Sequence, residues 1–180
     1  MTQRIIGVAG WKNSGKTTLV ERLVGTLSAR GYSVATVKHA HHSFDIDHEG
    51  TDSFRHRAAG AGEVAIVSGR RWALVHEIGE EEDEPGLDEI LARLSPCDIV
   101  IVEGYKREGH QKIEVRRRDA HDTAPLAPDD PTIVAIASDH PLQSEGQPVF
   151  DLDDIGKIAD FIEKACGLAA PSGRASSLDT

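Results

Sequence analysis

The chain has few of the residues that mark secreted or membrane proteins. Its 180 residues include only two cysteines, Cys97 and Cys166, which are too few and too far apart for a disulfide framework or a zinc knuckle. The longest aliphatic run is Ile99 to Val102, far short of the roughly 20 residues of a membrane-spanning helix. Residues 1–4 lead directly into a predicted strand, so no signal peptide is expected. These absences predict a cytoplasmic protein without a membrane segment.

Positive charge is also scarce. The formal net charge is −10, whereas a general nucleic-acid binder needs a basic surface to displace counterions. Much of the negative charge falls in the acidic block 80–84, which is typical of a solvated loop. Basic residues gather at 70–71 and 116–118, where they either meet a polyphosphate or acidic partner or are solvated strand ends. General nucleic-acid binding is therefore not expected.

One glycine-rich stretch carries most of the functional information. Residues Gly10 to Thr17 match the P-loop pattern G-x-x-x-x-G-K-[ST] without a mismatch. A strand-like segment precedes them, and apolar residues at helical spacing follow, from Leu19 to Leu27. In this context backbone N–H groups surround a β-phosphate, the lysine reaches the β- and γ-phosphates, and the threonine hydroxyl is a ligand to Mg²⁺. The stretch predicts triphosphate binding, through Gly10, Lys12, Asn13, Ser14, Gly15, Lys16, Thr17 and Thr18.

Alternating strand-like and helix-like segments predict an α/β fold. Two strand-like segments around residues 68–71 predict a β-hairpin. We predict a P-loop NTPase-like three-layer sandwich with a mostly parallel central sheet, forming one domain over residues 1–166, and a disordered tail at 167–180. Strands are expected at 5–9, 33–37, 64–67, 72–78, 99–102, 112–115, 132–137 and 149–150, and helices after the P-loop, after an Asp52 cap, over 87–94 and after an Asp153 cap.

An acidic residue at the tip of a neighbouring strand would complete a magnesium site. Asp98 and Glu103 flank the buried strand 99–102, and about 3.3 Å per residue places them at opposite edges of the sheet. The P-loop follows the carboxyl end of its own strand, and parallel neighbours share that edge. Glu103 is therefore the predicted partner of Thr17 at the metal, and Asp98 a strand-entry or capping residue. Pairing of Glu103 with Lys12 or Lys106 is the alternative.

The loop after the second predicted strand is rich in histidine and aspartate. Imidazole suits zinc, nickel or copper, whereas the aspartates suit Mg²⁺ and water. Three interpretations stay open: a transition-metal site, contact with Mg²⁺ or phosphate, and a solvated loop. The candidate residues are Lys38, His39, His41 and His42 for phosphate, substrate or switching, and Asp45 and Asp47 for metal.

The sequence lacks the N-K-x-D motif by which many P-loop proteins read guanine. Its single asparagine is Asn13, inside the P-loop. Asp139 follows a predicted strand where a base-reading loop would lie, and a carboxylate there would accept both guanine N–H groups and favour GTP. An ordinary turn before Pro141 is the alternative.

Taken together, these segments resemble the MobB family of molybdopterin-guanine dinucleotide biosynthesis adapter proteins. The resemblance is carried by the P-loop, by the runs 37–42 and 44–47, by the Asp-Ser-Phe-Arg-His-Arg run at 52–57 and its continuation to 61, and by Val102 to Lys106. It implies a GTP- and Mg²⁺-binding dimer of weak GTPase activity, working with molybdopterin and a MobA-like molybdopterin guanylyltransferase.

Two other classes remain open from the residues alone. A metallochaperone GTPase would use the histidine loop as a metal depot. A small-molecule kinase would use Arg107 and residues 116–118 as an arginine-bearing lid. No catalytic residue is assigned, because neither a glutamine nor an arginine finger is evident; Arg55 and Arg57 are the candidates for the latter.

Overall fold

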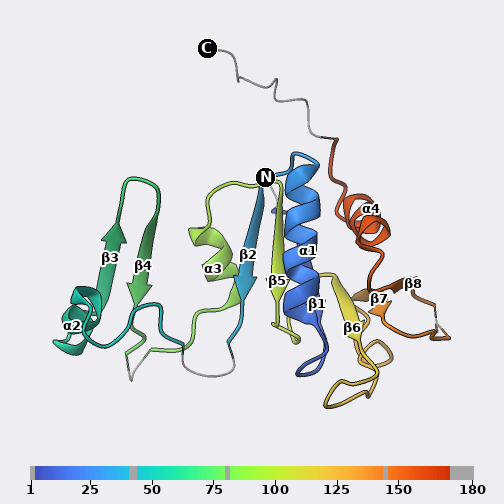
Figure 1. Ribbon diagram of the computed structural model, residues 1–180, viewed down its shortest axis with the longest axis horizontal. Coiled ribbons are helices and arrows are strands. Elements are labelled where there is room, and N and C mark those ends of the chain that lie inside the picture. Colours follow the sequence, from blue (N-terminus) through green and yellow to red (C-terminus); the bar gives the residue numbers. More distant parts are fainter. Residues whose placement is uncertain (1–2, 41–43, 80–81, 144–145, 171–180) are drawn as a thin grey trace, which may run out of the picture. The chain divides into compact units, whose positions relative to one another are not determined.

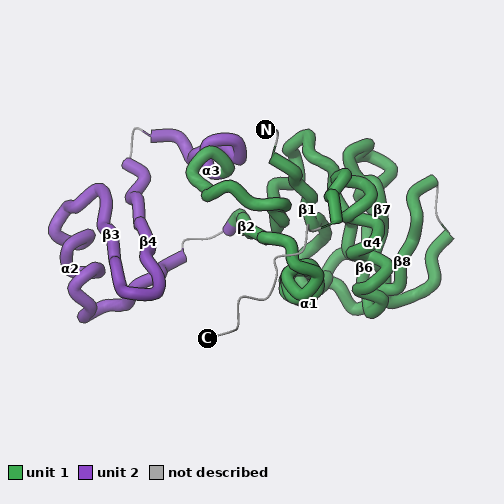
Figure 2. Tube along the Cα trace, turned by 90° about the horizontal axis from the view of Figure 1, so that it is seen from above, with its two compact units in different colours: residues 1–39, 91–180 green, residues 40–90 purple. Residues whose placement is uncertain are grey.

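The computed structural model describes residues 3–40, 44–79, 82–143 and 146–170. Within these residues the chain forms two compact units, residues 1–39 with 91–180, and residues 40–90 (Figure 2). One domain over residues 1–166 is the expectation from the sequence. In chain order the elements are β1 (Ile5–Ala9), α1 (Lys16–Ala29), β2 (Val34–Lys38), α2 (Asp52–Ala58), β3 (Glu63–Val67), β4 (Trp72–His76), α3 (Leu87–Arg93), β5 (Ile99–Glu103), β6 (Lys112–Arg116), β7 (Ile133–Ser138), β8 (Val149–Asp151) and α4 (Ile155–Ala165) (Figure 1).

The first unit is built on a six-stranded sheet in the order β2-β5-β1-β6-β7-β8. Every pairing in this sheet is parallel, as the alternation of strands and helices predicts. Because β1 lies between β5 and β6, the loop after β1 is flanked by the carboxyl ends of both neighbours. The α/β fold with a mostly parallel sheet and a separate hairpin is confirmed.

The main hydrophobic core lies between the sheet and helices α1 and α4. Alternate residues of β1, β5, β6 and β7 point into it, including Ile6, Ile101 and Ile113, all fully buried. Helix α1 contributes Leu19, Val20, Leu23 and Leu27, and α4 contributes Ile155, Ile158, Ala159 and Ile162. This packing holds the start of α1 rigidly beside the end of β1, where the P-loop lies.

The opposite face of β6 carries charge and is nevertheless buried. Lys112 is 0% exposed and Glu114 is 1% exposed. The Lys112 ammonium donates to Thr132 Oγ1 at 2.6 Å and to the Glu108 carbonyl. Glu114 accepts hydrogen bonds from the backbone N–H groups of Leu126 and Ala127, so the segment between β6 and β7 covers this face.

The second unit contains α2 and the antiparallel hairpin of β3 and β4. The register pairs Val67 with Trp72 and Ala65 with Leu74, as expected for the predicted hairpin. Its side chains are mostly exposed, and Val64 is the buried residue of β3. A two-stranded sheet is marginally stable alone, so this unit depends on further packing.

Two predicted helix caps are wrong by one residue. Thr51, not Asp52, caps α2, because its hydroxyl accepts from the Phe54 N–H while Asp52 is already helical. Asp154, not Asp153, caps α4 and accepts from the Lys157 N–H. Both predictions failed because two capping residues stand side by side, and local sequence does not choose between them.

The predicted tail boundary falls on the end of α4. Gly167 has a φ of 59°, and the Leu168 N–H donates to the Glu163 carbonyl at 2.8 Å, which is the Schellman arrangement of a helix end. Leu168 packs against the main core. Residues 171–180, the rest of the predicted tail, lie outside the described residues.

Among the described residues, none of the helices combines the length and the apolar character needed to cross a membrane.

Candidate nucleotide-binding site

The P-loop has the strand–loop–helix geometry that the sequence predicts. It joins β1 to α1, and the left-handed residues Asn13 (φ 63°) and Gly15 (φ 91°) let the backbone curl before the helix starts. Gly10 is also at positive φ, and a β-carbon there would lie 2.7 Å from the Val115 carbonyl oxygen. The first N–H groups of a helix lack partners inside the helix and carry the positive end of its dipole, so this loop is built to hold an anion.

Lys16 is the central positive group of the site. Its ammonium donates to the Trp11 carbonyl at 2.6 Å. Burial lowers the pKa of Lys16, and so do the nearby positive charges of Lys106 and Lys38, while Glu103 acts in the other direction. Three ammonium groups thus lie close together. Phosphate oxygens placed among them would relieve their mutual repulsion.

The buried hydroxyl of Ser14 also lacks a hydrogen-bond partner. Its side chain is 1% exposed, and its hydroxyl makes no hydrogen bond within the protein. A buried hydroxyl without a partner costs free energy of about 1–3 kcal/mol. A phosphate oxygen could accept this bond, so the residues present fit a bound polyphosphate.

Thr17 and Glu103 meet as the parallel strand order predicts. The Thr17 hydroxyl donates to Glu103 Oε1 at 2.8 Å, and the Lys38 ammonium lies 3.5 Å from the same oxygen. Glu103 is the last residue of β5 and Lys38 the last of the adjoining β2, while Thr17 lies in the first turn of α1. A hydroxyl and a carboxylate are suitable ligands for Mg²⁺, and these residues fit the ion.

Three contacts at the rim of the site were not found from the sequence. The Lys106 ammonium lies 4.2 Å from the centre of the Trp11 ring, a cation–π contact, and the Trp11 indole N–H donates to the Ala124 carbonyl at 2.7 Å. The ring of His39 lies 4.7 Å from that of Tyr105, whose φ is 47°. Tyr105 follows Gly104, and the Gly-Tyr-Lys run after β5 was the signal that could have pointed here.

The histidine-loop candidates are only partly described. Lys38 and His39 lie at the end of β2 beside Glu103, and the His39 N–H donates to the Glu103 carbonyl at 2.9 Å. His41 and His42 lie outside the described residues. In the part of the chain that the structure describes, no group of three or more His, Cys, Asp or Glu side chains is arranged to hold a metal ion.

Asp45 and Asp47 form ion pairs in the second unit. Arg57 donates to Asp47 at 2.5 Å, to Glu77 at 2.6 Å and to Asp45 at 3.2 Å. Its hydrogen bonds lower the pKa of the buried Asp47 carboxyl. Because the Arg57 guanidinium engages both carboxylates, this geometry does not favour a metal ion there. The assignment of Asp45 and Asp47 as metal ligands stays a prediction. Arg55 is exposed and pairs with Asp52 at 3.8 Å.

Asp139 follows β7 and is fixed by its own surroundings. Its Oδ1 accepts from the Arg118 N–H at 3.0 Å and lies 2.7 Å from His140 Nδ1. The His140 bond is the main cause that lowers the pKa of Asp139, so the carboxylate stays charged. Its place at the carboxyl edge of the sheet is where a base-reading acid is expected, and that role stays a prediction.

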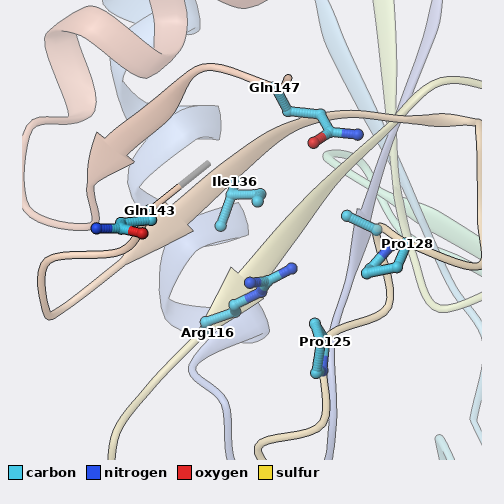
Figure 3. Close-up of a pocket in the computed structure, with 7 residues that line it drawn as sticks. Arg116, Pro125, Pro128, Ile136, Gln143 and Gln147 are labelled. Carbon is cyan, nitrogen blue, oxygen red and sulfur yellow. The ribbon is translucent and has the colours of Figure 1, made fainter. Parts of the chain in front are cut away.

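A cavity of about 280 Å³ lies beside β6 and β7 (Figure 3). Arg116 and Ile136 line it from neighbouring strands, and Pro125 and Pro128 line it from the segment between them (Figure 3). No P-loop residue is among its lining residues, which also include Ala127, Gln143 and Gln147. The cavity is therefore separate from the phosphate site.

Comparison with known proteins decides the family. A family model described as molybdopterin guanine dinucleotide synthesis protein B, MobB, matches residues 5–139. The chain belongs to the MobB family. A molybdopterin-guanine dinucleotide biosynthesis adapter protein from Haemophilus influenzae is 37% identical over 159 residues, which cover 88% of this chain and 87% of that relative. The corresponding adapter protein of Escherichia coli is 37% identical over 160 residues, covering 88% of this chain and 90% of the relative.

Solved MobB structures share the fold. A crystal structure of molybdopterin-guanine biosynthesis protein B superposes with a TM-score of 0.68 at 30% identity, covering 91% of this chain and 99% of that one. The Bacillus subtilis MobB structure gives a TM-score of 0.70 at 25% identity, covering 91% and 98%. The resemblance found in the P-loop and the Asp-Ser-Phe-Arg-His-Arg run is confirmed over nearly the whole chain.

Proposed function

We propose that this chain is an adapter in the biosynthesis of molybdopterin guanine dinucleotide, and that it binds GTP with Mg²⁺ at its P-loop. The observation that carries the nucleotide part is the cluster of Lys16, the unpartnered Ser14 hydroxyl and the Thr17–Glu103 pair at one sheet edge. The adapter part is supported by the two relatives that carry this name and cover most of the chain.

In this proposal the chain's own residues bind and hold the triphosphate. The P-loop N–H groups, Ser14 and Lys16 hold phosphate oxygens, and Thr17 and Glu103 would hold the magnesium ion. Magnesium would neutralise phosphate charge when bound. Of the arginines first considered as fingers, Arg57 is engaged by three carboxylates, which does not favour it as a finger. The proposal includes at most slow hydrolysis. The nickel-delivery alternative has no support among the described residues, because none of them forms a metal cluster.

The adapter role can be tested by identifying the proteins that bind this chain. Tagged protein recovered from its native cytoplasm should bring with it a MobA-like molybdopterin guanylyltransferase and bound molybdopterin, identified by mass spectrometry. Recovery of nickel- or zinc-enzyme assembly factors instead would refute the adapter role.

Base preference rests on Asp139. Calorimetry with Mg²⁺ should give tighter binding of GTP than of ATP, and Asp139→Ala should narrow that ratio by roughly 10- to 100-fold, because a carboxylate accepting two guanine N–H groups contributes about 1.5–3 kcal/mol. Asp129→Ala, in the turn before β7, is the matched control and should leave the ratio unchanged. An unaltered ratio in Asp139→Ala would remove this residue from the base site.

The hairpin offers a surface for a second copy of the chain. Val67, Trp72 and Leu74 share one face of the β3–β4 sheet and are 75%, 71% and 47% exposed. Contiguous exposed apolar side chains are typical of a protein interface, and a sheet with two open edges suits self-complementary pairing about a two-fold axis. We therefore propose a homodimer that buries this face.

Charge on that face should separate the dimer. Trp72→Glu combined with Leu74→Glu should move the sedimentation coefficient from dimer to monomer at micromolar concentration, because two carboxylates would be desolvated at the contact. Arg70→Glu, in the turn of the same hairpin, should remain dimeric. A double variant that sediments as the unsubstituted dimer does would rule out this face as the interface.

A further inference from the structure

Arg117 lies directly against the P-loop. It follows the last residue of β6, and a β-carbon built on Gly15 would lie 2.8 Å from its Nε and 3.2 Å from its Cζ. Because a β-carbon is one bond from its α-carbon, the guanidinium lies within about 4–5 Å of the Gly15 α-carbon. Gly15 caps α1 and belongs to the loop whose N–H groups would face the phosphates of a bound nucleotide.

The guanidinium lacks a partner where it touches the loop. The Arg117 Nε is buried and makes no hydrogen bond within the protein. A buried charged donor without an acceptor is costly, and such groups are ordinarily paired. Its neighbour in space is a loop built to hold an anion, and the Ser14 hydroxyl of that loop is unpartnered too. Two buried donors without acceptors therefore lie at one anion-binding loop, which indicates that one bound anion would accept from both.

The chain on both sides of Arg117 is anchored. The Arg116 guanidinium donates to the buried Glu114 at 2.7 Å, and Glu114 in turn accepts from the backbone of the β6–β7 segment. The Arg118 N–H donates to Asp139. These bonds hold the residues on both sides of Arg117, and its guanidinium already lies against Gly15 in the protein without a ligand. Arg57 of the second unit differs, because its guanidinium is held by carboxylates.

We propose that Arg117 binds phosphate oxygens of the nucleotide held in the P-loop, supplying from the end of β6 a positive group in addition to Lys16. This inference rests on the proposed nucleotide binding. The ligand class is a nucleoside polyphosphate, which guanidinium recognises through charge-assisted hydrogen bonds. The φ of 91° at Gly15 favours glycine, and the missing side chain leaves room for the guanidinium beside the loop.

The test compares Arg117 with its exposed neighbour in the full chain. Titration calorimetry with GTP and Mg²⁺ should show Arg117→Ala binding roughly tenfold or more weakly than the unsubstituted protein. Arg118→Ala removes an equal charge from the adjacent residue and keeps the backbone hydrogen bond to Asp139. Its affinity for GTP should therefore lie within about twofold of that of the unsubstituted protein. Arg117→Met keeps the apolar stem without the charge, and it replaces the alanine variant if that variant does not fold. Arg117→Lys should recover part of the affinity.

Each outcome separates this inference from the function on which it rests. If the unsubstituted protein binds no GTP, both fall. If it binds GTP and Arg117→Met binds equally well, only the role of Arg117 falls. If Arg118→Ala loses as much GTP affinity as Arg117→Ala, the loss reflects net charge, and the inference about Arg117 is overturned. A structural role would also overturn the inference. In that case Arg117→Met would bind GTP more weakly and melt at a lower temperature without nucleotide, and Arg117→Lys would recover no affinity.

Discussion

Lys16→Ala is expected to weaken GTP binding on the order of 100-fold or more, because the variant loses charge-assisted hydrogen bonds to two phosphates. The fold should survive. The Lys16 side chain donates a hydrogen bond to the Trp11 carbonyl, while α1 is held by its buried leucines. Burial and two neighbouring ammonium groups already lower the Lys16 pKa, so its removal relieves repulsion in the unliganded protein. Calorimetry with Mg²⁺ measures the affinity, and circular dichroism measures the fold.

A lysine far from the phosphates provides the control. Lys164 lies exposed in the last turn of α4, and Lys164→Ala should bind GTP as the unsubstituted protein does. If Lys16→Ala keeps its affinity within about twofold, the P-loop assignment is refuted, because no other lysine of the pattern can replace it. If both lysine variants lose affinity equally, the loss reflects overall charge and the assigned contact is also refuted.

Gly10→Ala is expected to destabilise the protein by about 3 kcal/mol, through a strained backbone and a steric clash. Gly10 has a φ of 153°, and an added β-carbon would lie 2.7 Å from the Val115 carbonyl and 2.6 Å from the Ser14 hydroxyl. The carbonyl belongs to β6 at the centre of the sheet and cannot move away cheaply. For a chain of this length the melting temperature should fall by roughly 10 °C, which differential scanning calorimetry measures.

Gly25 gives a matched control with the opposite expected sign. It lies inside α1, and a β-carbon there would meet no atom within 4 Å. Gly25→Ala should therefore raise stability by up to about 1 kcal/mol, because alanine favours the helix. A Gly10→Ala variant that melts with or above the unsubstituted protein would show that the loop is free to rearrange, against the geometry argued for it.

The P-loop was predictable because its information is local. A buried strand, a glycine loop and an amphipathic helix follow one another without interruption, so the pattern at residues 10–17 also specified its structural context. Glu103 was predictable for a topological reason, since parallel strands end at one edge, and its hydrogen bond to Thr17 agrees with that argument. The acid at the other edge, Asp98, accepts from the Ser33 N–H at 2.7 Å, as a strand-entry residue should.

The alternation of residues in β6 does not reveal that its charged face is buried. Lys112, Glu114 and Arg116 alternate with apolar residues, a pattern that ordinarily places charges on a solvated face. Here the segment after β6 folds back over that face and supplies hydrogen-bond partners, so Lys112 and Glu114 are buried. The strand pattern alone contains no information about that cover, because the cover comes from distant residues.

By itself, the sequence determined the phosphate cradle, the parallel α/β class, the hairpin and the family, because each depends on spacing between near neighbours or on a long match of residues. Only the tertiary structure decided which arginine touches the loop, and that Arg57 is occupied by Asp45, Asp47 and Glu77. Those outcomes depend on contacts between residues far apart in the chain. Several equally charged side chains could compete for each contact, and packing selects among them.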